Sequence, residues 1–329
     1  MGPAPAVATV RNAVRDAISD LEPGDLVLAA CSGGADSLAL AAALAFTAPR
    51  AGLRAGGITV DHGLQEGSAA TAGRVTAALA SFGMNPVLSR AVTVAGGGGP
   101  EAAARAARYR ALEEAAGQTG AKAVLLGHTL DDQAETVLLG LARGSGARSL
   151  SGMPPRRGVF RRPLLGTRRS VTVDACAALG LDPWTDPHNA DRRYARVRVR
   201  LDALPALEAA LGPGVAEALA RTADQLRADA ETLENLAAER ISADSPLATD
   251  SLAGLPDAVR TRVLRSAAIA AGCPPGALTA GHVERVAELV TDWHGQRWID
   301  LPGGVRAARR DGRVLFTHKT LRGSGDGRT

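Results

Sequence analysis

The sequence contains few of the residues on which disulfide-bonded or metal-bearing folds depend. Its three cysteines, Cys31, Cys176 and Cys273, are far apart, and no CxxC pair occurs. This spacing argues against a disulfide framework, a zinc site and an iron–sulfur cluster, so we interpret all three as small buried residues. Aromatic residues make up 3% of the 329 residues although 46% are hydrophobic, so the cores must consist mainly of Ala, Leu and Val.

Long apolar runs are also missing. No run reaches the ~18 residues of a membrane-spanning helix, and the N-terminus lacks the basic-then-apolar pattern of a signal peptide. We therefore expect a cytoplasmic protein with no membrane partner, and its length allows two or three domains. The sequence does not distinguish a monomer from a homodimer.

Lysine is almost absent, and arginine is unevenly spread. Residues 143–200 contain 13 Arg and 4 Asp, a net charge of +9, which leaves −5 for the rest of a chain whose formal charge is +4. Arginine forks suit phosphates, so this segment predicts a surface for a polyanion such as RNA. A solvated arginine-rich face is the alternative. The alternation over residues 194–200 suggests an extended strip with charge on one side. The candidate RNA contacts are Arg156, Arg157, Arg161, Arg162, Tyr194, Arg196, Arg198 and Arg200.

A phosphate-binding turn is predicted near the N-terminus. The apolar run 26–31 is followed by the sequence SGGADS and then by an Ala/Leu-rich helical pattern, an order typical of strand, tight turn and helix. Backbone N–H groups and hydroxyls in such a turn converge on an anion. A carboxylate there suits a magnesium ion held beside the phosphates. The turn is neither a Walker A loop nor GxGxxG, and an ordinary glycine-rich turn is the alternative. Its residues are Ser32, Gly33, Gly34, Ala35, Asp36 and Ser37.

Strands and helices alternate in the first half of the chain. Further strands are expected at 53–60, 85–94 and 121–126, with helices at 66–82 and 100–117. This order predicts an α/β fold with a doubly wound, mainly parallel sheet, whose ligands lie beyond the carboxyl ends of the strands.

The second half of the chain has a different pattern. After a loop-like stretch from Arg143, helices are expected at 167–179, 206–240, 255–271 and 279–291, and a small β meander at 296–316. We expect a catalytic domain over 1–205, a smaller, mostly helical domain over 206–321 with a boundary near Pro205, and a polar tail over 322–329.

Acidic residues begin the helix after the fourth strand. Asp131, Asp132 and Glu135 follow His128 at spacings of three and four, which predicts a magnesium site or a site for a cationic amine. Favourable pairing of first-turn acids with the helix dipole is the alternative. On the preceding helix Arg108 is placed to reach a polyphosphate. His62, after the second strand, is a candidate base contact or a strand cap.

Taken in order, seven motifs resemble the tRNA(isoleucine) lysidine synthetase family, within the pyrophosphate-loop ATP pyrophosphatases: SGGADS, DHGL, EAAARAARY, GHTLDDQAETVLLGLARGSG, RRPLL, DPHNAD and RYARVRVR. The resemblance implies an adenine nucleotide alpha hydrolase-like domain and a helical tRNA-binding domain. It also implies ligation of free L-lysine to carbon 2 of the wobble cytidine in isoleucine tRNA with a CAU anticodon. ATP would adenylate the carbonyl oxygen, and the lysine amine would then displace AMP.

The resemblance also implies roles for the candidate residues. The SGGADS loop and His62 would bind ATP, and Asp36 would ligate Mg²⁺. The lysine amine would lie at Asp131, Asp132 and Glu135. The implied catalytic residues are Asp36, Arg108, His128, Asp132 and Glu135. 

Thr129, Gln65 and Val197 depart from the residues usual in the family, and the additional C-terminal domain of longer members is not in this sequence. A related tRNA-modifying enzyme, such as a thiolase with the same loop, or a non-catalytic ATP- and RNA-binding module is the alternative.

Overall fold

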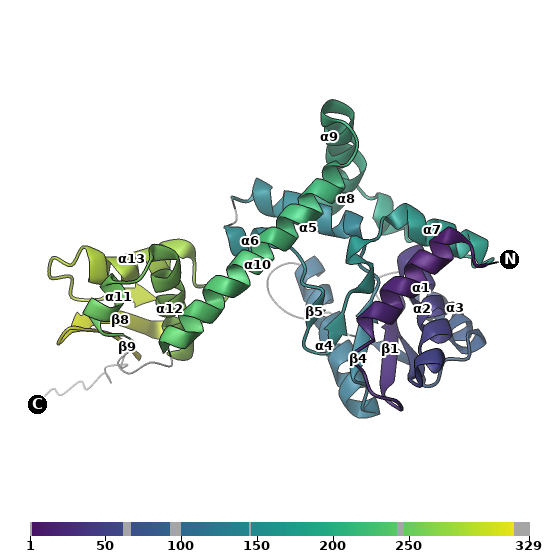
Figure 1. The fold of residues 1–329 in the computed structure, drawn as a ribbon, viewed down its shortest axis with the longest axis horizontal. Helices are drawn as coiled ribbons and strands as arrows, with labels where there is room; N and C mark the ends of the chain where they lie inside the picture. Colours follow the sequence, from purple (N-terminus) through teal and green to yellow (C-terminus); the bar gives the residue numbers. More distant parts are fainter. Residues whose placement is uncertain (1, 62–66, 93–99, 145, 242–246, 319–329) are drawn as a thin grey trace, which may run out of the picture. The chain divides into compact units, whose positions relative to one another are not determined.

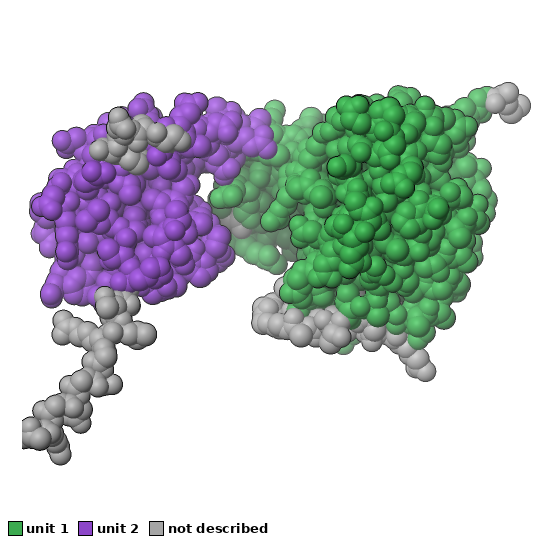
Figure 2. All heavy atoms as spheres, turned by 90° about the horizontal axis from the view of Figure 1, so that it is seen from below, with its two compact units in different colours: residues 1–227 green, residues 228–329 purple. Residues whose placement is uncertain are grey.

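The structure, a computed structural model, describes residues 2–61, 67–92, 100–144, 146–241 and 247–318. Its contacts divide the chain into two compact units, residues 1–227 and 228–329 (Figure 2). The division falls inside helix α10 (Val215–Ile241), downstream of the boundary expected near Pro205. The first half of α10 is tied to the first unit, since Arg227 donates hydrogen bonds to the carbonyls of Ser151 and Met153 at 2.6 and 3.1 Å.

The first unit is built on a six-stranded sheet in the order β3-β2-β1-β4-β6-β5. All neighbouring pairs are parallel except β5 with β6, so the predicted mainly parallel sheet is confirmed. The strands are β1 (Leu26–Ala30), β2 (Arg54–Asp61), β3 (Val87–Ala91), β4 (Ala123–Leu126), β5 (Arg156–Arg157) and β6 (Phe160–Arg161). The last two lie in a stretch expected to be a loop, because strands of two residues leave no periodic pattern in a sequence.

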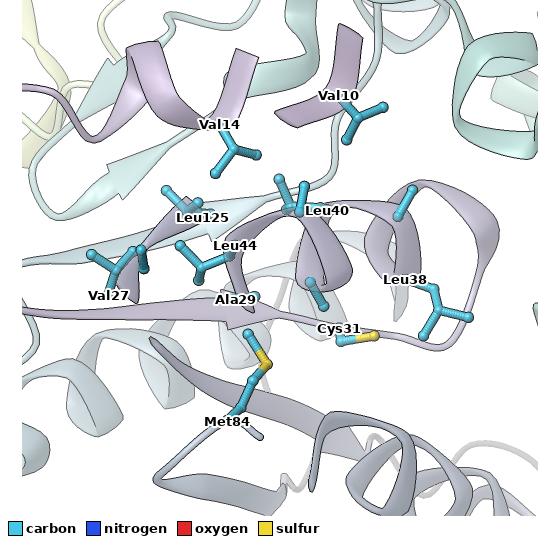
Figure 3. Packing of buried hydrophobic residues seen from close by; sticks show 14 of the residues in the cluster. Val10, Val14, Val27, Ala29, Cys31, Leu38, Leu40, Leu44, Met84 and Leu125 are labelled. Atoms are coloured by element: carbon cyan, nitrogen blue, oxygen red, sulfur yellow. The ribbon is translucent and has the colours of Figure 1, made fainter. Parts of the chain in front are cut away.

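Helices cover both faces of this sheet (Figure 1). Alternate residues of β1 point to opposite faces, so Val27 and Ala29 join one hydrophobic cluster, whereas Leu26 and Leu28 join another. The first cluster also takes residues from α1 (Pro5–Ala17), α2 (Ala35–Thr47), α3 (Ser68–Ser81) and α7 (Arg169–Ala178). The second takes residues from α4 (Pro100–Thr119). In Figure 3, Val10 and Val14 of α1 face Leu40 of α2.

Helix α5 (Leu130–Ala142) begins four residues after β4 and packs on the helices that follow the arginine-rich segment. Those are α9 (Leu204–Leu211) and α10, where the sequence predicted one helix over 206–240. The prediction was wrong because Gly212 and Gly214 adopt φ of +90° and +101° and Pro213 has no N–H to donate. A short helix, α6 (Ala147–Leu150), packs against α5.

The second unit has its own core. Helices α11 (Thr249–Ala253), α12 (Asp257–Ala270) and α13 (Ala280–Thr291) pack on the antiparallel strands β7 (Ile299–Leu301), β8 (Val305–Arg310) and β9 (Arg313–His318). The tail expected over 322–329 lies outside the described residues. Within the described ranges, no helix is long and apolar enough to span a membrane.

The Asp20 carboxylate, three residues after the end of α1, binds two arginines at the β5–β6 edge of the sheet. Arg161 donates to both oxygens of Asp20, at 2.5 and 3.1 Å, and Arg156 donates to one of them at 2.9 Å. The side chain of Arg161 is only 10% exposed, whereas that of Asp20 is 45% exposed. The hydrogen bond from Arg161 holds the pKa of Asp20 below its usual range.

We predict that Asp20→Asn lowers the free energy of unfolding by ~1–2 kcal/mol at pH 7, because it leaves a buried guanidinium without its counter-ion. Because the pKa of Asp20 is lowered in the folded state, this contribution is present above the unfolded pKa and disappears as the pH falls toward the folded one. Urea denaturation measures both effects. Asp16→Asn is the control, because the ion pair of Asp16 with Arg15 is long, at 3.7 Å, and both side chains are exposed. Equal stability of the two variants would contradict the prediction.

Candidate active site

The SGGADS loop is rigidly built where β1 meets α2. Gly33 has φ of +90°, and a Cβ there would lie 2.9 Å from Val75 Cγ2. The Ser37 hydroxyl accepts a hydrogen bond from the Ser32 amide at 3.1 Å and donates to the Gly34 carbonyl at 3.0 Å. The loop therefore holds its own shape and directs the first amides of α2, which lack partners within the helix, toward an anion.

The end of β4 lies directly against this loop. Strands β1 and β4 are parallel neighbours with Ala30 opposite Leu126, so their carboxyl ends are side by side. A Cβ at Gly127 would approach the backbone atoms of Asp36 and Ser37 to 3.1 Å. Glycine at this position therefore permits the loop and the start of α5 to form one site.

Both oxygens of Asp36 are engaged by the first turn of α7. The hydroxyl of Thr172 donates to Oδ1, and Nε of Arg169 donates to Oδ2 at 3.2 Å. Burial raises the pKa of Asp36 above its usual range, although Thr172 and the charge on Arg169 oppose that effect.

Two acidic residues of α5 lie on the other side of the same guanidinium. Asp132 accepts from the Thr129 amide at 2.9 Å in a capping box, and its second oxygen accepts from Arg169 Nη2 at 2.8 Å. Glu135, whose side chain is 0% exposed, accepts from Arg169 Nη1 at 3.5 Å. We call Asp36, Asp132 and Glu135 the carboxylate cluster. 

At the centre of the cluster, the charged forms of Asp132 and Arg169 are favoured. Burial acts to raise the pKa of Asp132, but Arg169 and the Thr129 amide outweigh it and the pKa is lowered. Burial likewise acts against the charge of Arg169, but Asp132, Asp36 and Glu135 raise its pKa above the usual value. Arg169 and Asp132 therefore form a charged pair across the physiological pH range.

Sequence reasoning missed Arg169 and Thr172. One signal was available: Arg168 and Arg169 stand at the start of a predicted helix, where the helix dipole disfavours cations. Two arginines in that position require anionic partners from elsewhere in the fold. The structure supplies those partners from α2, α5, α9 and α10.

The arginine-rich segment reaches the cluster through a helix and not through the extended strip that the alternation suggested. Residues Ala195–Arg198 form α8, and Val199–Ala203 form a π-helical turn. Arg196 and Arg200 are four residues apart and thus share a helical face. Arg200 donates to Glu135 at 2.7 and 3.1 Å, and Arg196 Nε lies 3.6 Å from Glu135 Oε2. Arg198 instead donates to two backbone carbonyls, those of residues 192 and 193.

Asp131 is separated from the other two acidic residues of α5. Its Oδ2 accepts from the Arg169 backbone amide at 2.7 Å, and its Oδ1 accepts from Arg168 Nη1 at 3.3 Å. The structure therefore places Asp131 at the N-terminus of α7, outside the carboxylate cluster, where its negative charge suits the helix dipole.

His128 and Arg108 lie close enough to interact electrostatically. His128 Nδ1 and Arg108 Nε are both buried, and neither has a hydrogen-bond partner among the described residues. Burial, reinforced by the charge of Arg108, lowers the pKa of His128 to about 3. Arg108 Nε is a donor, and Nδ1 of a neutral imidazole donates or accepts according to its tautomer, so the two suit a polar ligand. His62, the candidate contact to a nucleotide base, lies outside the described residues.

The remaining predicted RNA contacts lie around the β5–β6 edge and α8. Arg162 donates to the Pro154 carbonyl at 2.7 Å and to the Tyr109 hydroxyl at 3.2 Å. Together with Arg156 and Arg161 it lines a surface cavity of about 260 Å³. Arg157 is exposed, and Tyr194 precedes α8 as its N-cap residue.

The donor chemistry at Asp36 fits a magnesium ion. Mg²⁺ is commonly held by one or two carboxylates together with substrate phosphates, and the Asp36 carboxylate follows directly on a phosphate-type loop. The cation beside it in this structure is the guanidinium of Arg169. Among the described residues, no group of three or more His, Cys, Asp or Glu side chains is arranged to hold a metal.

The fold and the loop define an ATP-binding protein of the PP-loop class: residues 7–207 match the family described as the PP-loop domain. Residues 247–315 match the TilS substrate binding domain. The chain belongs to the tRNA(Ile)-lysidine synthase family, and the resemblance in the motifs is confirmed.

Two relatives illustrate this membership. The tRNA(Ile)-lysidine synthase of Thermobifida fusca is 59% identical over 96% of this chain and 99% of its own length. That of Streptomyces coelicolor is 53% identical over 96% of this chain and 99% of its own length.

A solved structure shares the fold. It is the U34-tRNA thiolase NcsA from Methanococcus maripaludis with its [4Fe-4S] cluster, with 18% identity and a TM-score of 0.57 over 67% of this chain and 79% of that one. The likeness concerns the fold alone. In the present chain the three cysteines are free thiols, each buried.

We predict that Gly127→Ala weakens ATP binding about tenfold or more, because the added methyl overpacks against the backbone of the SGGADS loop at a cost of ~1–3 kcal/mol. Calorimetric titration of the free enzyme with ATP measures this. Gly117→Ala is the matched control, since a Cβ there meets nothing within 4 Å. ATP affinity in Gly127→Ala equal to that of the control would contradict the close approach.

We predict that His128 stays neutral down to pH 5. Its folded pKa of about 3 lies below the usual 6.5, so its contribution to stability is present above pH 6.5 and is lost as the pH falls toward 3. Titration of the imidazole signals by NMR, with His128→Gln for assignment, checks this. A midpoint between pH 6 and 7 for His128 would overturn the assignment.

Proposed function

We propose that the protein ligates free L-lysine to carbon 2 of the wobble cytidine of isoleucine tRNA with a CAU anticodon, using ATP and Mg²⁺. The observation that carries this proposal is the carboxylate cluster, which lies within hydrogen-bond reach of one guanidinium directly beside the SGGADS loop. Simple nucleotide binding does not require a second acidic group there. The names of relatives at 59 and 53% identity support the same reaction.

In the activation half of the reaction, ATP phosphates bind at the amides of residues 32–37 and the positive end of α2. The cytidine carbonyl oxygen attacks the α-phosphorus, and the bond to pyrophosphate breaks. Arg108, with its unpaired Nε, stabilises the charge that develops on the phosphates. When bound, Mg²⁺ neutralises phosphate charge, and Asp36 is the residue that would hold it.

In the ligation half, the lysine side-chain amine forms a bond to carbon 2, and AMP leaves with the oxygen that was adenylated. Asp132 and Glu135 attract the ammonium group and accept its proton, since a protonated amine is not a nucleophile. The lowered pKa of Asp132 keeps it charged for the first of these tasks. Neutral His128 lies near Asp132 and is available to hydrogen-bond a substrate. Asp131 is assigned to holding α7 and contributes to the lysine site only through that contact.

The tRNA would contact the arginine-rich segment and the second unit. The exposed residues Arg157 and Arg198 are the best placed to meet phosphates. Arg156 and Arg161 already share Asp20, and Arg200 already binds Glu135, so their contacts with RNA would be secondary to these pairs. We propose a cytoplasmic location, which such a substrate requires.

Incubation of the protein with radiolabelled lysine, ATP, Mg²⁺ and tRNA transcripts tests the function. We predict that label enters the CAU isoleucine transcript and not the same transcript with a changed first anticodon base. Unlabelled tRNA, under conditions in which the protein binds ATP, would refute the proposed reaction.

Asp36→Asn is the companion variant. We predict that it abolishes pyrophosphate release, because an amide keeps the shape of the side chain but loses the charge that a hard cation requires. Affinity for tRNA, measured by filter binding, is expected to change less than about twofold because exposed arginines supply it. Wild-type turnover in this variant would remove Asp36 from the mechanism.

A further inference from the structure

Two adjacent arginines at the start of α7 have separate partners. Arg169 points to the carboxylate cluster, and Arg168 points to Asp131, Glu208 and Glu217. We propose that Arg168 is a positioning residue for the reaction: it fixes the first turn of α7, and the hydrogen bonds from that turn hold Asp36 in place. The effect expected on kcat rests on the proposed function, whereas the effect expected on ATP binding does not.

The strongest contact of Arg168 is with α10. Its Nε donates to one oxygen of Glu217 at 2.6 Å, and its Nη2 donates to the other at 2.5 Å. This two-pronged geometry is the most directional contact available between a guanidinium and a carboxylate. The Arg168 side chain is 33% exposed and that of Glu217 is 36% exposed, so the pair is partly shielded from solvent.

Two further carboxylates connect the same guanidinium to α5 and α9. Glu208 lies 3.4 Å from Arg168 Nη2, and it also accepts from the amides of Gly214, just before α10, and Ala216, in its first turn. Asp131 lies 3.3 Å from Arg168 Nη1 and accepts from the Arg169 amide. One cation therefore stands among three anions from three helices, and without it those anions would repel one another.

The link from Arg168 to the chemistry runs through a single helical turn. Both hydrogen-bond donors to the Asp36 carboxylate, Arg169 and Thr172, belong to the first turn of α7. The Thr172 hydroxyl also lies 2.7 Å from the Arg169 carbonyl, so its one proton is shared between that carbonyl and Asp36, and the residues of this turn are linked to one another. A shift of this turn therefore moves both partners of Asp36 together, although Arg168 itself has no hydrogen bond or ion pair to the carboxylate cluster among those found in the described residues.

A double-mutant cycle tests the proposal with Arg168→Gln, Glu217→Gln and the variant carrying both. We predict that each single change weakens ATP binding by the free protein, measured calorimetrically with Mg²⁺ present, and lowers kcat, each about tenfold. The double variant should be no worse than the single ones, because both changes remove the same contact. The KM for tRNA should stay within about twofold, and Arg168→Lys should recover part of the loss.

Arg221→Gln is the matched control, because Arg221 is an exposed arginine one turn along α10 from Glu217. It should bind ATP like the wild type, and the melting temperatures of all variants show whether they are folded. The proposal would be overturned if the losses of ATP affinity in the two single variants multiplied in the double variant. It would also be overturned if the variants lost affinity for tRNA alone. A different outcome would separate the two claims. If ATP affinity changes as expected in the variants but even the wild type incorporates no lysine into tRNA, the proposed reaction is refuted and the positioning role of Arg168 stands.

Discussion

The guanidinium of Arg169 among three carboxylates is the interaction on which the site depends. Burying Glu135 completely, next to Asp132 and close to Asp36, would be strongly unfavourable without a compensating cation. Arg169 supplies the charge and donates one hydrogen bond to each of the three carboxylates. Arg200 donates to both oxygens of Glu135. A lysine side chain in place of Arg169 would supply the charge without the fixed fork. Helix α7 thus has to be docked before the site can form.

The composition of the chain suits this arrangement. With so few aromatic rings, the sheet is covered mainly by Ala, Val and Leu side chains, and helices and loops approach closely. Gly127 lies against the loop backbone, and Gly33 faces Val75. The one aromatic pair found among the described residues is Tyr109 with Phe160, whose ring centroids are 5.0 Å apart. It packs α4 onto β6, the strand between β4 and β5.

Local patterns were sufficient to predict the loop, the parallel strands and the acidic start of α5. Each depends on residues close together in sequence, such as Ser32 to Ser37. The partners of Asp36 could not be predicted in this way, because Arg169 and Thr172 are 133 and 136 residues away. The period of two in the arginines from 196 to 200 was misleading, since a spacing of four also fits a helix. The break at Gly212 to Gly214 was readable from the sequence but was outweighed by the long helical pattern around it.

The central claim is that the carboxylate cluster receives the lysine amine while Asp36 serves the phosphates and their metal. A crystal structure with L-lysine, Mg²⁺ and a non-hydrolysable ATP analogue tests it most directly. The account predicts the side-chain ammonium within hydrogen-bond distance of Asp132 or Glu135, and Asp36 bound to the metal. An ammonium group bound elsewhere, with Arg169 still holding all three carboxylates, would contradict it.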